Sequence, residues 1–196
     1  LKTDDPHVKL GNSHYLVTET DESDPSFSKL TPHLVVLTNL DREHLDNYNN
    51  SYTKLEASML ELMNSIPFYG KVFVNGDDKN SVKLLPKINR AVCTFGLNKK
   101  NNITAKSIKY IDGKKMQFDV IFSKQTYKVC TNLLGKHNVY NILSAISVCL
   151  HLDISITDTI KSLNSFFGAR RRFDVYENIY INKYKPIIID DYGHHP

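Results

Sequence analysis

The sequence is poor in cysteine, and Cys93, Cys130 and Cys149 are spaced too widely for a Cys-x-x-Cys metal or redox motif. An odd number of cysteines also argues against a disulfide framework, so we expect a reduced, cytoplasmic setting. The net charge is also small, because 25 Lys and Arg stand against 21 Asp and Glu and leave a formal net charge of +4. The positive residues are spread along the chain, which does not favour a nucleic-acid partner. With 41% apolar residues over 196 positions, the chain can bury a core and is not disordered.

Long hydrophobic runs are also missing. Residues 1–12 contain no apolar stretch of the kind that a secretion signal needs. The apolar residues 142–152 are interrupted by two serines and a histidine, so this stretch is too short and too polar to span a bilayer. We therefore expect no membrane partner. Residues 186–189 have the pattern of a buried strand and lead at once into a polar cluster, which we interpret as a boundary between domains.

Strands and helices alternate through the first half of the chain. Residues 52–66 carry apolar side chains at helical spacing, with an N-cap at Asn50 or Ser51 and with Pro67 after the last turn. Apolar segments before and after this helix predict four strands, over residues 14–20, 33–38, 71–75 and 91–95. A further short helix is expected to end at Leu85. This alternation predicts an α/β fold, namely a doubly wound, mostly parallel sheet with helices on both faces.

The second half begins with β structure. Residues 103–133 contain the hairpin signal Asp112-Gly113, which predicts a small antiparallel β subdomain attached to the main sheet. Helical spacing returns in residues 138–152 and 155–167, and Gly168 is the expected C-cap of the second helix. Two strands, 173–181 and 186–189, are expected around a turn at Asn182-Lys183. We expect one domain over residues 1–196 with the subdomain 103–133 inside it.

Four polar clusters follow strand ends or open a helix, where open α/β sheets bind ligands. Two of them are rich in carboxylates: residues 19–24 (ETDESD) and residues 38–46 (TNLDREHLD). Because neighbouring parallel strands bring their C-terminal loops together, Glu19 and His44 could jointly hold Mg²⁺, an ion that prefers oxygen ligands. When each cluster is taken alone, a solvated acidic loop explains the first better than a metal site does, and a surface or capping histidine explains the second better.

The third cluster, residues 135–141 (GKHNVYN), opens a helix. Asn138 and Asn141 stand three residues apart, so both amides point to the same side and could read the edge of a purine. The alternative is that Asn138 is simply an N-cap. The fourth cluster combines the arginines at 170–172 with Asp191 and His194, which could neutralise or position a phosphoryl group or its metal; the alternative for the arginines is a solvated basic turn.

A phosphate-binding loop of the type GxxxxGK[ST] is missing. Gly135-Lys136 is followed by His137, and no other Gly-Lys pair precedes Ser or Thr. From its residues alone, the chain is therefore an α/β domain of the kind that binds an anion and a metal.

Six segments in a fixed order make the sequence resemble the central domain of the Mur ligases, the ATP-dependent amide-forming enzymes of bacterial peptidoglycan synthesis. They are ETDESD (19–24), TNLDREHLD (38–46), IPFYG (66–70), GKHNVYN (135–141), RRFD (171–174) and DDYGHHP (190–196). DESD and DDYGHHP favour the family member that joins L-alanine to UDP-N-acetylmuramate. The resemblance implies a three-domain enzyme whose phosphate loop and UDP-sugar domain precede residue 1 and whose closing domain follows residue 196.

The resemblance also implies a site, carried over position by position. Its members are Glu19 and His44 as magnesium ligands, His137, Asn138 and Asn141 on the adenine side, Arg171 and Arg172 at the terminal phosphate as catalytic groups, and Asp191, His194 and Tyr192 at the nucleotide-side hinge. The implied cofactors are ATP and Mg²⁺, and the implied partners are UDP-N-acetylmuramate, L-alanine and the two missing domains. A sister ligase that adds a peptide to the same sugar nucleotide, or a stand-alone nucleotide- or metal-binding module, are the alternatives.

Two positions depart from the family pattern. The family usually shows Gly-Arg-Arg-Phe-Asp, whereas here Ala169-Arg170 precedes Arg171, which could change the turn that carries the arginines. Glu56 stands near the start of the helix after His44, where relatives often have a lysine. Any role of that lysine in positioning a metal would be moved or lost in this chain.

Overall fold

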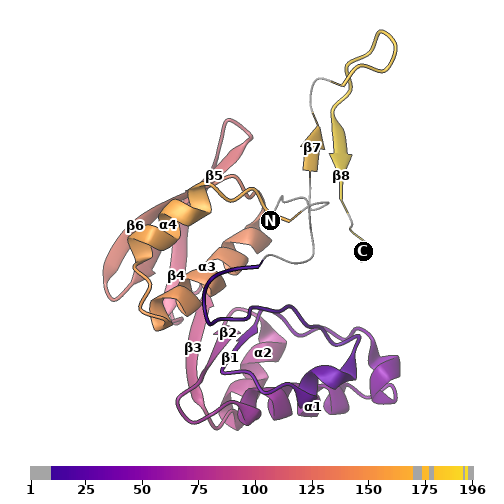
Figure 1. The fold of residues 1–196 in the computed structure, drawn as a ribbon, viewed down its shortest axis with the longest axis vertical. Coiled ribbons are helices and arrows are strands. Elements are labelled where there is room, and N and C mark those ends of the chain that lie inside the picture. The colour runs from indigo at the N-terminus through magenta and orange to yellow at the C-terminus, as the bar shows by residue number, and fades with distance from the viewer. Residues whose placement is uncertain (1–9, 170–173, 177–178, 192, 194–196) are drawn as a thin grey trace.

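The computed structural model of the chain describes residues 10–169, 174–176, 179–191 and 193. They form one six-stranded sheet, helices packed on it, and a separate two-stranded hairpin (Figure 1). The strands are β1 (Leu34–Leu37), β2 (Lys71–Asn75), β3 (Ala91–Gly96), β4 (Ile103–Ile111), β5 (Lys115–Phe122), β6 (Gln125–Thr131), β7 (Asp174–Tyr176) and β8 (Ile188–Asp190). The α-helices are α1 (Tyr52–Ser65), α2 (Lys79–Leu84), α3 (Lys136–His151) and α4 (Ile156–Asn164), and the 3₁₀ turns are η1 (Pro25–Lys29), η2 (Leu45–Tyr48) and η3 (Leu85–Lys87).

The large sheet has the strand order β1-β2-β3-β4-β5-β6. Strands β1 to β4 pair in parallel, and β4, β5 and β6 continue the sheet in antiparallel fashion. The hairpin between β4 and β5 turns at Asp112 and Gly113, which both have positive φ, as a tight two-residue turn requires. The predicted mostly parallel α/β sheet and its antiparallel region are thereby confirmed.

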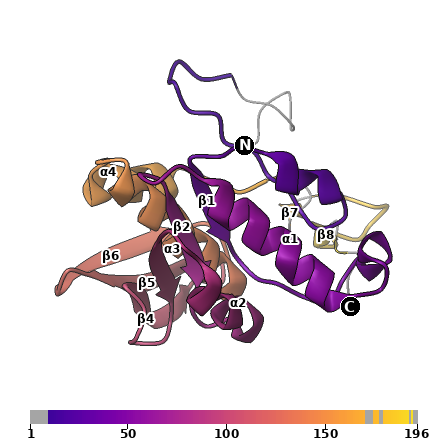
Figure 2. The same cartoon turned by 90° about the horizontal axis from the view of Figure 1, so that it is seen from below.

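The alternation of side chains along β2 separates two cores. Val72 and Val74 are fully buried in one core with Leu55 of α1 and Leu84 of α2. Phe73 points to the opposite face and belongs to a second core, which contains the buried α3 residues Val139, Ile142, Leu143 and Ile146. In Figure 2, α1 and α4 lie on opposite sides of β1 and β2. Helices therefore cover both faces of the sheet. This arrangement is stable because each apolar side chain of this size that is buried stabilises the fold by about 1.5–3 kcal/mol.

Helix α1 matches its prediction, with Ser51 at the N-cap and Ile66-Pro67 after its end. Helix α3 begins at Lys136, two residues before the predicted start, because Gly135 takes the N-cap position. Helix α4 ends at Asn164, and its C-cap is Ser165, so the prediction of Gly168 as the cap was wrong. The amides of Ser165 and Phe166 bond to the carbonyls three residues earlier, which tightens the last turn and ends the helix.

Two further predictions were wrong in part. Residues 14–20 are irregular rather than a strand, with Leu16 91% and Val17 93% exposed; a strand needs a neighbour to satisfy its backbone, and no described strand pairs with them. The two closing strands are shorter than predicted, although a bridge from Ile181 to Tyr184 surrounds the predicted turn. Residues 186–189 are not a buried strand, since Ile187 is 67% and Ile189 51% exposed.

No helix within the described residues is long and apolar enough to cross a bilayer.

Candidate functional site

The loop after β1 carries His44 in the left-handed conformation, with φ 49° and ψ 31°. A non-glycine residue pays about 1–3 kcal/mol for such a conformation, which persists only where its surroundings fix it. Two asparagine amides fix this loop from the neighbouring elements. Asn75, at the end of β2, donates to the Thr38 carbonyl at 2.9 Å, and Asn80 of α2 donates to the Leu40 carbonyl at 2.8 Å.

The acidic segment 19–24 is bound to the 3₁₀ turn that follows His44. The side-chain amide of Asn47 donates to the Ser23 carbonyl at 2.8 Å, and the Tyr48 hydroxyl donates to the Glu22 carbonyl at 2.9 Å. Tyr48 is only 4% exposed, so its ring anchors this contact in the core below α1. The first two predicted clusters therefore lie together, although the acidic segment does not follow a strand, because residues 14–20 are irregular.

Asp21 of this acidic segment interacts electrostatically with His44. The Ser23 hydroxyl and its backbone N–H both donate to Asp21, and these bonds, with a smaller contribution from His44, hold the pKa of Asp21 below its usual value. Glu19, the residue predicted to be the ligand, is exposed two positions earlier in the segment. Asp21 was not singled out in the sequence, because nothing in the ETDESD pattern separates one carboxylate from its neighbours.

The donors of this region suit a magnesium ion. In the part of the chain that the structure describes, no three His, Cys, Asp or Glu side chains gather into a complete metal site. Mg²⁺ commonly takes only one or two protein carboxylates and completes its shell with water and substrate phosphates. A carboxylate of the acidic segment beside the fixed turn of His44 meets that requirement, so the residues present fit the ion.

The start of α3 depends on Gly135. This residue has φ +97°, and a Cβ on it would lie 2.6 Å from Cε1 of His137. Only glycine therefore allows the chain to enter the helix with the imidazole folded against the turn. His137 itself is exposed in the first turn of the helix, where free backbone N–H groups favour anions.

Asn138 and Asn141 lie side by side, as their spacing predicted. The Asn141 amide donates to Oδ1 of Asn138 at 3.3 Å, and Asn138 in turn donates to the Leu134 carbonyl at 2.7 Å. Since Gly135 is the N-cap, Asn138 is not a simple N-cap. Its amide instead links the helix to the preceding loop and presents the pair on one face. Contact of this pair with adenine stays a prediction.

The remaining predicted residues lie in the C-terminal segment. Asp191 follows β8 and accepts a hydrogen bond from the Gly193 N–H at 2.7 Å. The hairpin of β7 and β8 stands apart from the large sheet (Figure 1). Arg171, Arg172, Tyr192 and His194 lie outside the described residues, and their roles stay predictions.

Two residues that could have a functional role, Asp77 and Tyr52, were not predicted from the sequence. Asp77, at the end of β2, accepts a hydrogen bond at 3.2 Å from the hydroxyl of Tyr140, a residue within the opening turns of α3. The only sequence feature that pointed to Asp77 was the run Asn75-Gly76-Asp77-Asp78, which predicted the end of a strand. On α1, burial together with the charge of Glu56 raises the pKa of Tyr52, whose buried hydroxyl has no hydrogen-bond partner within the described structure.

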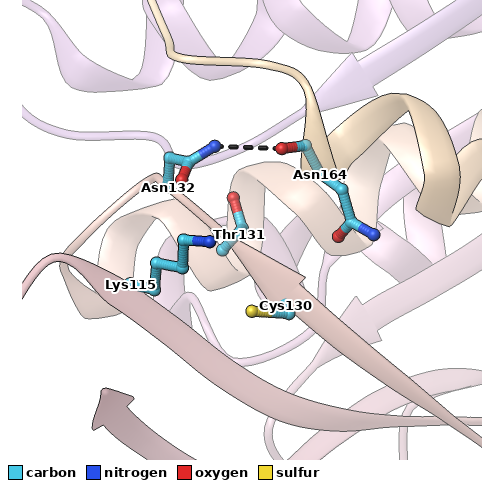
Figure 3. A pocket seen from close by; sticks show the side chains of 5 residues that line it. All are labelled: Lys115, Cys130, Thr131, Asn132 and Asn164. Atoms are coloured by element: carbon cyan, nitrogen blue, oxygen red, sulfur yellow. Dashed lines mark hydrogen bonds between the residues drawn. The ribbon is translucent and has the colours of Figure 1, made fainter. Parts of the chain in front are cut away.

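A small cavity of about 170 Å³ lies between the end of β6 and the end of α4 (Figure 3). Its lining is polar on one side, where Asn132 donates to the Asn164 carbonyl at 3.0 Å. Lys115, Cys130 and Thr131 complete the lining. None of these is a predicted site residue, and the volume is below the roughly 300–1,000 Å³ of ordinary small-molecule sites.

The polar loops at the carboxyl ends of parallel strands define an α/β ligand-binding domain of the doubly wound class. Residues 7–149 match the family described as Mur ligase middle domain. The match covers more than half of the chain, so the chain belongs to the Mur ligase family.

Curated relatives agree with this assignment. The UDP-N-acetylmuramate–L-alanine ligase of Vesicomyosocius okutanii is 42% identical over 192 residues, which are 97% of this chain and 41% of that protein. The enzyme of the same name from Neisseria gonorrhoeae is 38% identical over 97% of this chain and 42% of its own length. The chain thus spans about two fifths of the length of these relatives.

Solved structures share the fold. The UDP-N-acetylmuramate–alanine ligase MurC of Thermotoga maritima superposes with a TM-score of 0.73 at 26% identity, over 89% of this chain and 38% of that one. MurF ligase of the same organism, in complex with ADP, superposes with a TM-score of 0.67 at 19% identity, over 82% of this chain and 35% of its own. At that identity, the likeness to MurF concerns the fold alone.

Proposed function

We propose that these 196 residues form the central part of a longer bacterial ligase that joins L-alanine to UDP-N-acetylmuramate at the expense of ATP. The observation that carries the proposal is the 42% identity to a UDP-N-acetylmuramate–L-alanine ligase over 97% of the chain. The fixed turn of His44 and the opening turns of α3 support it, because both follow strand ends where such a domain binds nucleotides.

The reaction begins with two anions. A carboxylate oxygen of the lactyl group attacks the γ-phosphorus of ATP, the bond to the bridging oxygen breaks, and ADP leaves. The resulting acyl phosphate is attacked by the amine of alanine, which loses a proton as the amide forms and inorganic phosphate leaves. Arg171 and Arg172 are the groups proposed to offset the charge of the transferred phosphoryl group.

Glu19 and His44 would hold Mg²⁺, with Asp21 beside His44. When bound, the ion supplies positive charge that offsets the repulsion between the carboxylate and the phosphates. The residues of the chain orient the nucleotide: His137, Asn138 and Asn141 on the adenine side, and Asp191, Tyr192 and His194 at the hinge. Such positioning contributes a large part of the catalysis when sites on several domains must close together.

Alanine-dependent phosphate release tests the proposal. The purified full-length ligase, with ATP, Mg²⁺ and UDP-N-acetylmuramate, should release phosphate only when L-alanine is added. The isolated 196-residue chain should release none. Release by the full-length protein with a peptide but not with alanine would favour the sister ligase instead. Absence of release with either would leave a non-catalytic binding module.

The metal assignment has a separate test. His44→Ala in the full-length ligase should raise the Mg²⁺ concentration needed for half-maximal activity, because one ligand is lost. His14→Ala, an exposed histidine outside the proposed site, is the matched control and should leave the metal titration unchanged. An unaltered Mg²⁺ dependence in His44→Ala would refute the assignment.

A further inference from the structure

The carboxylate of Asp77 joins three segments that are distant in the sequence. Oδ2 accepts from the backbone N–H of Leu97 at 2.5 Å and from the Tyr140 hydroxyl at 3.2 Å. Oδ1 accepts from the backbone N–H of Asn98 at 3.1 Å and from the side-chain amide of Asn101 at 2.9 Å. The end of β2, the turn between β3 and β4, and the start of α3 therefore meet at one side chain.

Two glycines leave the room that this arrangement needs. A Cβ on Gly96 would lie 2.7 Å from Cγ of Asp77, and a Cβ on Gly76 would lie 1.8 Å from Oδ1 of Asn101. Both distances are far below a van der Waals contact, so neither position accepts a larger side chain without displacing the carboxylate or the amide. The backbone on both sides is thus shaped around Asp77.

Tyr140 is the only member of this network that lies on α3. Its ring packs against the core beneath the sheet, and it lies three residues after His137 and next to Asn141. Burial, followed by the charge of Asp77 and the hydrogen bond to it, raises the pKa of Tyr140 to about 12. The hydroxyl therefore stays protonated near neutral pH and remains a donor to the carboxylate.

We propose that Asp77, acting through Tyr140, is a positioning residue that fixes the opening turns of α3 for nucleotide binding. This inference rests on the proposed function, because it takes His137, Asn138 and Asn141 as the adenine-side contacts. The physical reason is that α3 follows the irregular connection Leu133-Leu134-Gly135, and a charge-assisted bond from the sheet limits rotation and sliding of the helix start. Asp77 itself touches neither substrate nor metal in this role.

The first test is Tyr140→Phe in the full-length ligase. It removes one hydroxyl and keeps the ring in the core. We expect KM for ATP to rise roughly threefold to tenfold, kcat to change less than about twofold, and KM for UDP-N-acetylmuramate to stay constant. Tyr127→Phe removes a hydroxyl that bonds to Gln125 on the antiparallel sheet, far along the sequence from Asp77, and should change none of the three constants. An equal change in both KM values, or none, would overturn the proposal.

A double-mutant cycle tests the coupling. In an Asp77→Asn background, which weakens the acceptor, Tyr140→Phe should raise KM for ATP much less than it does in the wild type. Full additivity of the two effects would show that Tyr140 acts without Asp77 and would contradict the proposal. If Asp77→Asn fails to fold, the split between the two KM values in Tyr140→Phe decides the matter alone.

A third variant separates this inference from the proposed function. Asn138→Ala removes a proposed adenine contact directly and should raise KM for ATP. If it does so while Tyr140→Phe has no effect, the nucleotide site stands and the positioning role is wrong. If neither Asn138→Ala nor His137→Ala changes KM for ATP, the adenine-side assignment is wrong. The positioning role of Asp77 is then wrong as well, because it depends on that assignment.

Discussion

The side-chain amide of Asn47 donates to the backbone carbonyl of Ser23 at 2.8 Å, across 24 residues of sequence. This bond joins the acidic segment 19–24 to the turn that carries His44. Neither part belongs to a regular strand or an α-helix, so side-chain-to-backbone bonds of this kind hold the proposed metal region together. The bond from Tyr48 to Glu22 is the second such link.

Removing the link from Asn47 should weaken metal binding without touching a ligand. Asn47→Ala in the full-length ligase should raise the Mg²⁺ concentration for half-maximal activity about fivefold, because one net hydrogen bond is worth about 1 kcal/mol. A Mg²⁺ titration of phosphate release measures this. Asn132→Ala, which breaks a comparable amide-to-carbonyl bond to Asn164, is the control and should not shift the titration (Figure 3). The same shift in both variants would contradict a specific role.

Gly135→Ala should both destabilise the fold and impair nucleotide binding. The positive φ and the close approach of the His137 ring predict a loss of roughly 1–3 kcal/mol in the free energy of unfolding, and a higher KM for ATP. Gly113→Ala shares the positive φ, of +64°, but a Cβ there would meet nothing within 4 Å. It should cost roughly 1 kcal/mol and leave KM for ATP unchanged. Denaturant unfolding and steady-state kinetics separate the two effects.

The raised pKa of Tyr140 predicts a loss of stability in alkali. The folded protein holds this proton up to about pH 12, whereas the unfolded chain releases it near the ordinary pKa of 10.0. The associated stabilisation is therefore complete below pH 10 and is lost as the pH rises from 10 to 12. Unfolding measured at several pH values should show a smaller alkaline decline for Tyr140→Phe than for the wild type. Parallel curves for both proteins would count against the raised pKa of Tyr140, which burial and the charge of Asp77 cause.

The hairpin of β7 and β8 exposes apolar side chains of a kind that are normally buried. Ile187 and Ile189 are 67% and 51% exposed, and Tyr180 and Tyr184 are 70% and 66% exposed. Exposed apolar surface of this kind binds hydrophobic dyes such as ANS. The double variant Ile187→Thr/Ile189→Thr of the 196-residue chain should bind clearly less ANS, whereas Ile154→Thr, at an isolated position 42% exposed, should change little. Equal binding by all three proteins would place the dye elsewhere.

Periodicity and turn chemistry were sufficient to predict most of the fold. The helical spacing of Leu55, Leu62 and Ile66 gave α1, and Asp112-Gly113 gave the hairpin between β4 and β5. The failures are at positions where tertiary partners decide. Residues 14–20 are apolar and look like a strand, but a strand forms only when a neighbour pairs with it.

The candidate site was predictable in part, for a similar reason. Spacing along a helix is local, so the side-by-side placement of Asn138 and Asn141 could be read directly. The electrostatic interaction of Asp21 with His44, and the bond from Tyr140 to Asp77 across 63 residues, depend on how separate elements pack. No sequence pattern distinguishes Asp77 from Asp78, and the two differ only in the groups that surround them in the fold.

The proposed function requires that the full-length ligase activates a carboxylate with ATP. The most direct measurement uses UDP-N-acetylmuramate with ¹⁸O in both lactyl carboxylate oxygens, the full-length ligase, ATP and L-alanine. Attack on the γ-phosphorus predicts that one ¹⁸O atom per turnover appears in inorganic phosphate and the other stays in the new amide. Mass spectrometry that finds unlabelled phosphate, or ¹⁸O in AMP, would contradict the account.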